Sequence, residues 1–238
     1  MKIYPLIEGH FSVNKEKEFT LLNQESKGLK MAIQPFLIQL ENENILLDAG
    51  LGWLENNQPK LIQNLTELNL QPKDISKILI SHLHKDHING LVDTSSNVLK
   101  LIFPQAELYI QKREYEFALS QKESLSFDFK ILDFVINNSK IHWLNDNEGR
   151  ISNYIRYEVT PGHTPFLQSF WIEKNNRVIF YGSDNLPLEL YFKYHVAYKS
   201  DFNGKDAMKY RIEWEMEANK QHWEILYYHD LKNPIIEY

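Results

Sequence analysis

The sequence contains no cysteine among its 238 residues. Disulfide bonds, thiolate metal sites and cysteine nucleophiles are therefore excluded, and metal ligands would have to be histidines or carboxylates. No apolar run approaches the ~18 residues of a membrane-spanning helix, so we expect no membrane association. Lys15, Glu16, Lys17 and Glu18 lie where a signal peptide needs an apolar stretch, and cytoplasm is the expected location.

An excess of positive charge is also missing. Lysine and arginine total 26 against 32 acidic residues, which gives a formal net charge of −6. Because nucleic-acid binding depends on clustered cations, we expect a small-molecule substrate and no nucleic-acid partner. The aromatic residues (13 Tyr, 13 Phe, 5 Trp) fit core packing best, with an apolar substrate pocket or a homo-oligomer face as alternatives.

Apolar patterning alternates between strands and helices along the chain. Residues 35–50 predict a β-hairpin that ends at Asp48, and the periodic leucines of 60–70 predict an amphipathic helix. Further strands are expected at 77–81, 106–110, 154–160, 168–172, 177–181 and 223–228, with helices at 112–121 and 205–220. Residues 122–140 fit either type. The alternation predicts an α/β layered fold with helices on the sheet faces.

A histidine-rich loop follows the strand predicted at 77–81. Residues 81–90 read Ser-His-Leu-His-Lys-Asp-His-Ile-Asn-Gly, so that His82, His84, Asp86 and His87 form the pattern His-x-His-x-Asp-His. In an extended segment residues 82 and 84 point to the same side, where their imidazoles can converge on one ion. A helix that begins near Asp86 would turn this carboxylate and His87 toward a second ion. Imidazole and carboxylate together suit zinc.

Three more candidate ligands occur at predicted strand ends. They are His163 in Thr-Pro-Gly-His-Thr-Pro, Asp184 in Tyr-Gly-Ser-Asp, and His229 in Tyr-Tyr-His-Asp. Independent structural histidines do not explain seven such residues in this order. The set therefore predicts a metal site assembled from distant parts of the chain.

Together these residues resemble the metallo-β-lactamase superfamily. The resemblance runs from Asp48, which matches the acidic residue of the family's Asp-x-Gly turn, past Gly90 to His229. It implies one domain over residues 1–238 with a four-layer αβ/βα sandwich of two mixed sheets flanked by helices. When the family's ligand positions are carried over to this sequence, the resemblance implies that the first metal is held by His82, His84 and His163. The second is held by Asp86, His87 and His229, and Asp184 bridges both.

Such a site implies hydrolysis. Two zinc ions can share a bridging hydroxide near neutral pH, because zinc lowers the pKa of bound water to about 7. We expect attack on an ester-like bond, most readily a carboxylic ester or lactone, and count Asp86 and Asp184 as catalytic. The flavodiiron branch of the superfamily has an acidic residue where this chain has His84, so zinc is favoured over the alternatives, iron and manganese.

Substrate residues are less defined by the pattern. Lactonases of this fold carry a tyrosine three residues after the bridging aspartate, where this chain has Pro187. Tyr191, Tyr194 and His195 follow and are candidates to reach the site, with loop packing as their alternative role. Phosphodiesterase or thioesterase activity, an iron dioxygenase-like enzyme and a catalytically silent metal-binding module are the competing hypotheses.

Overall fold

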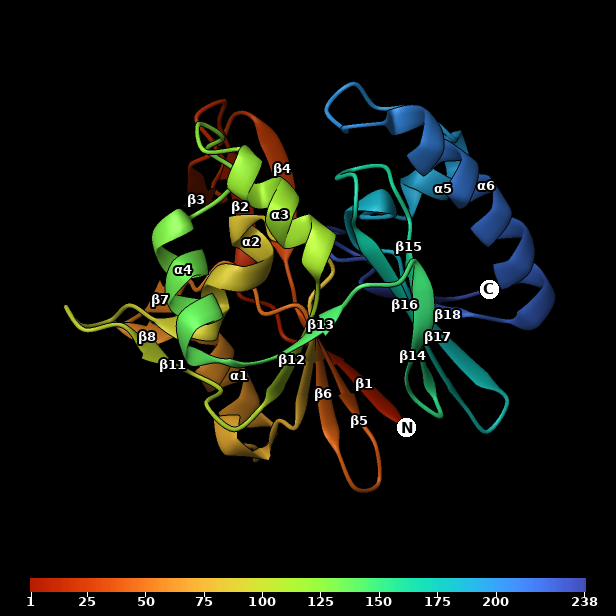
Figure 1. Cartoon of the computed structure of the whole chain (residues 1–238). Helices are drawn as coiled ribbons and strands as arrows, with labels where there is room; N and C mark the ends of the chain where they lie inside the picture. The colour runs from red at the N-terminus through yellow and green to blue at the C-terminus, as the bar shows by residue number, and fades with distance from the viewer. The chain divides into compact units, whose positions relative to one another are not determined.

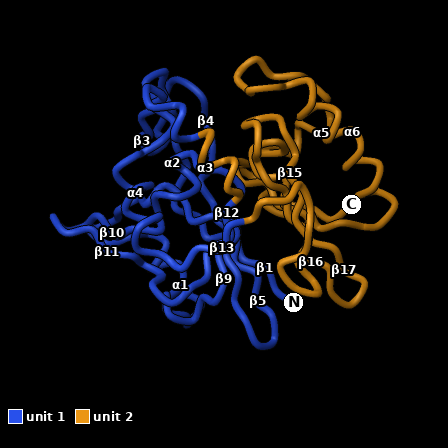
Figure 2. Tube along the Cα trace, in the orientation of Figure 1, with its two compact units in different colours: residues 1–110, 118–143 blue, residues 111–117, 144–238 orange.

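The computed structural model describes residues 1–238, which form two compact units (Figure 2). Unit 1 comprises Met1–Ile110 and Ala118–Trp143. Unit 2 comprises Gln111–Phe117 and Leu144–Tyr238. Each unit contains one six-stranded mixed sheet with helices packed on it, as the sequence pattern predicts. The expectation of a single domain over 1–238 stays a prediction.

The sheet of unit 1 has the strand order β1-β5-β6-β9-β12-β13. Its strands are β1 (Lys2–Pro5), β5 (Phe36–Gln39), β6 (Asn44–Leu47), β9 (Lys77–Leu79), β12 (Glu107–Gln111) and β13 (Lys140–Leu144). β5 and β6 pair antiparallel as the predicted hairpin, whereas β6, β9 and β12 run parallel. The carboxyl ends of β6 and β9 therefore lie at the same edge of the sheet, where Asp48 and the histidine-rich loop follow them.

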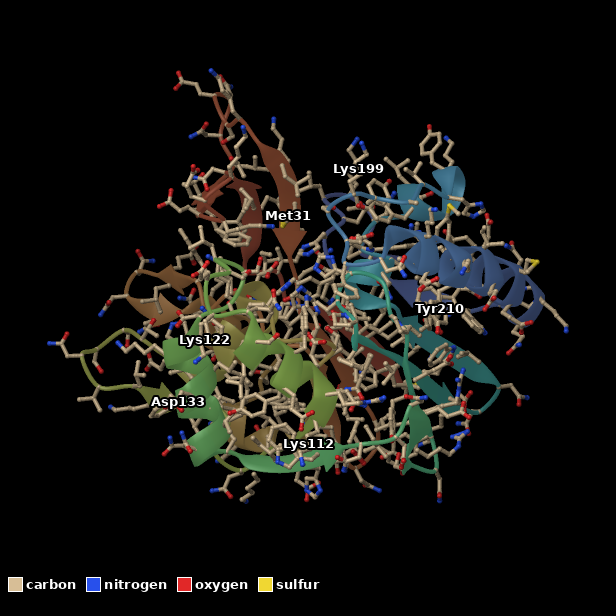
Figure 3. The ribbon with its side chains drawn as sticks, turned by 45° about the horizontal axis from the view of Figure 1, so that its top comes forward. Met31, Lys112, Lys122, Asp133, Lys199 and Tyr210 are labelled. Carbon is tan, nitrogen blue, oxygen red and sulfur yellow. The ribbon has the colours of Figure 1, made fainter.

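Unit 1 also contains three small sheets that the sequence pattern did not predict. The largest has the order β3-β2-β4 and holds Met31, which is labelled in Figure 3. The strands are β2 (Gly9–Val13), β3 (Phe19–Leu21), β4 (Leu29–Ile33), β7 (Leu54–Glu55), β8 (Gln58–Pro59), β10 (Val92–Asp93) and β11 (Lys100–Leu101). Phe11 of β2 is fully buried, and its ring packs edge-on against that of Trp53 with 5.0 Å between centroids.

The helices of unit 1 follow from apolar spacing and capping. They are α1 (Lys60–Glu67), α2 (Lys85–Ile88) and α4 (Phe129–Asn138), with 3-10 turns η1 (Pro72–Asp74) and η2 (Asn89–Leu91). Leu61 and Leu65 are the buried positions of α1, one turn apart. Asp128 caps α4 by accepting hydrogen bonds from the backbone N–H groups of Lys130 and Ile131. The ambiguous segment 122–140 therefore contains a helix, and α3 (Lys112–Ser120) precedes it.

The sheet of unit 2 has the strand order β14-β15-β16-β17-β18-β19. Its strands are β14 (Glu148–Ser152), β15 (Ile155–Val159), β16 (Gln168–Lys174), β17 (Arg177–Tyr181), β18 (Glu224–Leu226) and β19 (Ile235–Glu237). β16 and β17 form the predicted hairpin, and β17 and β18 run parallel. The ends of β17 and β18 therefore lie side by side, and the candidate ligands Asp184 and His229 follow them.

Two helices cover one face of this sheet (Figure 1). They are α5 (Leu190–Tyr194) and α6 (Gly204–Gln221), and the 3-10 turn η3 is Ser183–Asn185. Trp214 of α6 packs on Phe180 of the sheet, with 4.7 Å between ring centroids. The apolar row of Met208, Ile212 and Met216 does not make this contact; Met216 is 62% exposed. None of the helices is both long and apolar enough to cross a membrane.

Candidate metal centre

The histidine-rich loop of unit 1 begins where β9 ends. His82 lies in the segment without regular secondary structure between β9 and α2, and His84 is the extended residue immediately before α2. The Nε2 atom of His82 lies 3.1 Å from Nδ1 of His84, so the two rings meet through their nitrogens as the alternation predicts. Asp86 and His87 lie in the first turn of α2, with 3.8 Å between Oδ2 of Asp86 and Nε2 of His87. The loop thus gathers three imidazoles and a carboxylate.

Asp48 orients this loop. Its Oδ1 accepts a hydrogen bond from the backbone N–H of Ser81 (2.7 Å), and its Oδ2 accepts one from the Ser81 hydroxyl (2.6 Å). The same Oδ2 lies 2.8 Å from Nδ1 of His87. A carboxylate on Nδ1 fixes the ring and leaves Nε2 as the nitrogen available to an ion. Asp48 therefore contacts the ligand loop at both its start and the first turn of α2.

The backbone of Asp48 is also unusual, since its φ of 56° lies in the left-handed region. Aspartate tolerates this region better than most residues, at a cost of about 1–3 kcal/mol. The next turn carries Gly50 and Gly52, both with positive φ. Gly90 packs so closely on this turn that a Cβ would lie 1.9 Å from the carbonyl oxygen of Ala49. This contact explains why glycine occupies position 90.

Glu8, which lies between β1 and β2, holds the same turn in place. Its carboxylate accepts backbone hydrogen bonds from Leu51 (2.6 Å), Gly52 (3.1 Å) and Trp53 (3.1 Å), and the side chain is almost fully buried. Burial raises the pKa of Glu8 to about 8, although these three hydrogen bonds oppose the shift. The sequence offered no motif that singled out Glu8.

In unit 2 three candidate ligands meet at the strand ends. His163 follows β15, Asp184 lies in η3 after β17, and His229 follows β18. Oδ2 of Asp184 lies 3.3 Å from Nε2 of His163, and Oδ1 lies 3.1 Å from Nε2 of His229. Each oxygen of one carboxylate therefore faces a different imidazole. A carboxylate in this position can be shared between two cations, each held by a different histidine.

Two residues that the sequence pattern missed hold His163. Asn185 is fully buried, and its Oδ1 accepts a hydrogen bond from the backbone N–H of His163 (2.7 Å). Its Nδ2 donates to the carbonyl oxygen of Thr160 (2.6 Å). Oδ1 of Asp201 lies 3.2 Å from Nδ1 of His163, which repeats the relation of Asp48 to His87. Asn185 directly follows a predicted ligand, but Asp201 belongs to a loop without any recognisable motif.

The candidate substrate residues differ in their surroundings. Burial raises the pKa of Tyr191, and the charges of Asp201 and Asp184 raise it further, so Tyr191 lies within the electrostatic influence of the unit 2 ligands. Tyr194 is 59% exposed. His195 lies 2.8 Å from the Glu215 carboxylate of α6. The roles of these three residues toward a substrate stay predictions.

The donor chemistry of both units fits a metal such as zinc: neutral imidazole nitrogens and carboxylate oxygens, with the second ring nitrogen of His87 and of His163 held by an aspartate. Residues 32–187 match the model of the metallo-beta-lactamase superfamily. The chain belongs to this superfamily. The match covers the histidine-rich loop, His163 and Asp184, and the family resemblance inferred from the sequence is confirmed.

The sequence matches known proteins over only part of their length. An uncharacterized protein, YobT of Bacillus subtilis, is 32% identical over 149 residues, which are 60% of this chain and 58% of YobT. The exodeoxyribonuclease WalJ of Streptococcus pneumoniae is 38% identical over 74 residues, 31% of this chain and 24% of WalJ. The chain thus spans about a quarter to three fifths of these two relatives.

Solved structures extend the similarity of fold to the whole chain. A probable metal-dependent hydrolase from Staphylococcus aureus aligns with a TM-score of 0.79 at 20% identity, covering 100% of this chain and 92% of its own. AidC, described as a dizinc quorum-quenching lactonase, aligns with a TM-score of 0.70 at 23% identity, covering 87% and 75%. The fold is accordingly that of the superfamily, an α/β fold of mixed sheets and helices.

Proposed function

We propose that the two sets of ligands hold one pair of zinc ions and that the protein is a metal-dependent hydrolase of carboxylic esters or lactones. His82, His84 and His163 would hold one ion, Asp86, His87 and His229 the other, and Asp184 both. The observation that carries the proposal is the Asp184 carboxylate, whose two oxygens face Nε2 atoms of two different histidines at 3.1 and 3.3 Å. When bound, the ions would supply Lewis acidity toward the substrate and an acidified water.

The protein's own residues prepare the ligands for this role. Asp48 and Asp201 would hold His87 and His163 through Nδ1, so that Nε2 of each ring stays free of a proton and available to an ion. Asn185 would fix the main chain of His163 beside Asp184. Because these partners are themselves nearly buried, the ligand geometry is set before an ion binds.

Tyr191 is the proposed contact to the substrate. A tyrosine is protonated at neutral pH, and the raised pKa of Tyr191 keeps it so, which makes its hydroxyl a hydrogen-bond donor and not a base. Pro187 occupies the position of the lactonase tyrosine, and its carbonyl oxygen accepts a hydrogen bond from the backbone N–H of His229. A donor to a carbonyl oxygen would therefore have to come from another residue, and Tyr191 of α5 is the one that we propose.

The support for an ester or lactone is the likeness of fold to AidC, which is described as a lactonase. A second candidate, phosphodiester hydrolysis, is supported by the sequence match to the exodeoxyribonuclease WalJ. The acidic balance of the chain favours the first over the second, since phosphate backbones bind clustered cations.

A substrate panel separates the candidates. Purified protein loaded with zinc is assayed on p-nitrophenyl acetate and butyrate, an N-acyl homoserine lactone, a thioester and bis-p-nitrophenyl phosphate. We expect the highest kcat/KM on an ester or lactone, loss of that activity with a chelator, and recovery with zinc. A higher kcat/KM on the phosphodiester than on every ester and lactone would favour the second candidate function, phosphodiester hydrolysis. Full activity of metal-free protein would contradict the proposal, and bound zinc without any hydrolysis would favour a silent metal-binding module.

A further inference from the structure

Arg211 is a fully buried cation in the middle of α6, one residue after Tyr210, which is labelled in Figure 3. Burial lowers the pKa of its guanidinium, against the opposing charge of Asp201. An arginine is rarely buried unless its charge and its donors are compensated. The hydrogen bonds of its two terminal nitrogens show which parts of the chain this residue connects.

The guanidinium donates to two backbone carbonyl groups on different segments. Nη1 donates to the carbonyl oxygen of Asn185 at 2.8 Å, and Nη2 donates to that of Val196 at 2.6 Å. The rings of Tyr191 and Tyr198, which stack with 4.2 Å between centroids, lie 5.1 and 5.6 Å from the guanidinium carbon. Arg211 thus connects α6 to η3 and to the segment between α5 and α6.

Both segments carry partners of His163. Asn185 directly follows Asp184, and its side chain accepts the hydrogen bond from the His163 N–H. The segment that contains Val196 continues to Asp201, whose carboxylate lies 3.2 Å from Nδ1 of His163. Phe202 then donates its backbone N–H to the His163 carbonyl oxygen at 3.2 Å. A shift of either segment would therefore move His163 relative to Asp184.

We propose that Arg211 is a positioning residue for the metal ligands of unit 2, because its planar guanidinium holds η3 and the segment before Asp201 at a fixed separation. This inference rests on the proposed function, since it gives the ligands a metal to bind. Lysine cannot replace the two-pronged donor, because its ammonium group is a compact point charge that would reach one carbonyl group but not hold both.

The test compares R211K and R211M with wild type in zinc affinity, measured by competition with a chromophoric chelator. Removal of residues that orient metal ligands typically weakens metal binding by about 10–100-fold. We expect about tenfold weaker zinc binding for R211K and about 100-fold for R211M. R177M is the matched control: Arg177 pairs with Glu224 through two hydrogen bonds of 2.8 Å, and it is expected to bind zinc within about twofold of wild type.

A second measurement requires no metal and remains informative if R211M fails to fold. Amide hydrogen exchange of the metal-free proteins is followed at His163, Phe202 and Asn203, whose N–H groups bond across these segments. We expect at least about tenfold faster exchange in R211K than in wild type or R177M. The absence of zinc binding in wild type would overturn the proposed function alone, because the exchange result would still test Arg211. Zinc affinity and exchange rates equal to wild type in R211K would overturn the role of Arg211.

Discussion

Nδ1 of His87 lies 2.8 Å from Oδ2 of Asp48, and both side chains are completely buried. The pair joins the end of β6 to the first turn of α2, two elements that are about 40 residues apart in the chain. Asp48 adopts a strained backbone conformation in this arrangement, with a φ of 56°. The hydrogen bonds of the carboxylate to Ser81 and His87 offset the cost of this backbone conformation.

Replacing Asp48 tests this relationship. D48N keeps the size of the side chain but removes the charge that holds His87, so we expect about 10–100-fold weaker zinc binding, measured by chelator competition. The control is D133N, because Asp133 is an exposed residue of α4 (labelled in Figure 3). Zinc affinity of D48N within twofold of D133N would show that Asp48 is only a turn residue.

The buried carboxylate of Glu8 gives a prediction for pH. Its pKa is raised by burial from 4.5 to about 8, so the folded protein binds the proton more tightly than the unfolded chain between these values. Its contribution to stability is therefore complete below pH 4.5 and is lost as the pH rises toward 8, by at most about 1.4 kcal/mol per pH unit. Urea unfolding of metal-free wild type and E8Q from pH 5 to 8 measures the difference.

In that series the free energy of unfolding of wild type should fall with pH relative to E8Q, which has no titrating group at position 8. A constant difference between the two proteins over this range would mean that Glu8 is charged throughout, with its three backbone hydrogen bonds outweighing burial.

Gly90 is expected to tolerate no side chain. A Cβ at this position would lie 1.9 Å from the backbone oxygen of Ala49, and neither backbone segment can yield as a flexible side chain would. We expect G90A to lower the free energy of unfolding by about 1–3 kcal/mol or more. G9A is the comparison, because a Cβ there would meet only side-chain atoms of Leu21 and Phe11, at 3.0 Å. Equal unfolding free energies of G90A and G9A would contradict the packing described for the Asp48 turn.

Tyr191 and Tyr194 can be separated by removing one hydroxyl at a time. Y191F should lower kcat/KM on the best ester or lactone by up to about tenfold, the value of one hydrogen bond, with little change in zinc affinity. Y194F removes the hydroxyl of a ring that is 59% exposed, and the loss there should be smaller. A larger loss of kcat/KM for Y194F than for Y191F would contradict the proposal that Tyr191 contacts the substrate.

Local patterns in the sequence predicted the elements that carry the ligands. The His-x-His-x-Asp-His spacing predicted the nitrogen contact between His82 and His84, because alternation along an extended segment is a local property. Residues 122–140 could not be assigned from their pattern, since the apolar run of α4 fits a buried strand as well as a helix. The capping aspartate Asp128 was the signal that could have decided it.

Contacts between distant segments could be predicted for the motif residues His163, Asp184 and His229, but not for residues that carry no motif. Asp201 lies 38 residues from His163 in the chain and belongs to no motif, and no pattern in the sequence marks Arg211 as a fully buried residue. The apolar row that includes Met216 faces solvent, whereas Trp214 packs on the sheet, since the partner face selects which side of a helix is buried. The cytoplasmic location, the small-molecule substrate and the seven-ligand set remain predictions.

The central claim is that ligands from both units share one pair of ions. A crystal structure of zinc-loaded protein, with anomalous difference maps recorded on both sides of the zinc absorption edge, tests it most directly. We expect two zinc peaks, one ligated by His82, His84 and His163, the other by Asp86, His87 and His229, with Asp184 on both. Zinc bound to residues of one unit alone, or no zinc at these residues, would contradict it.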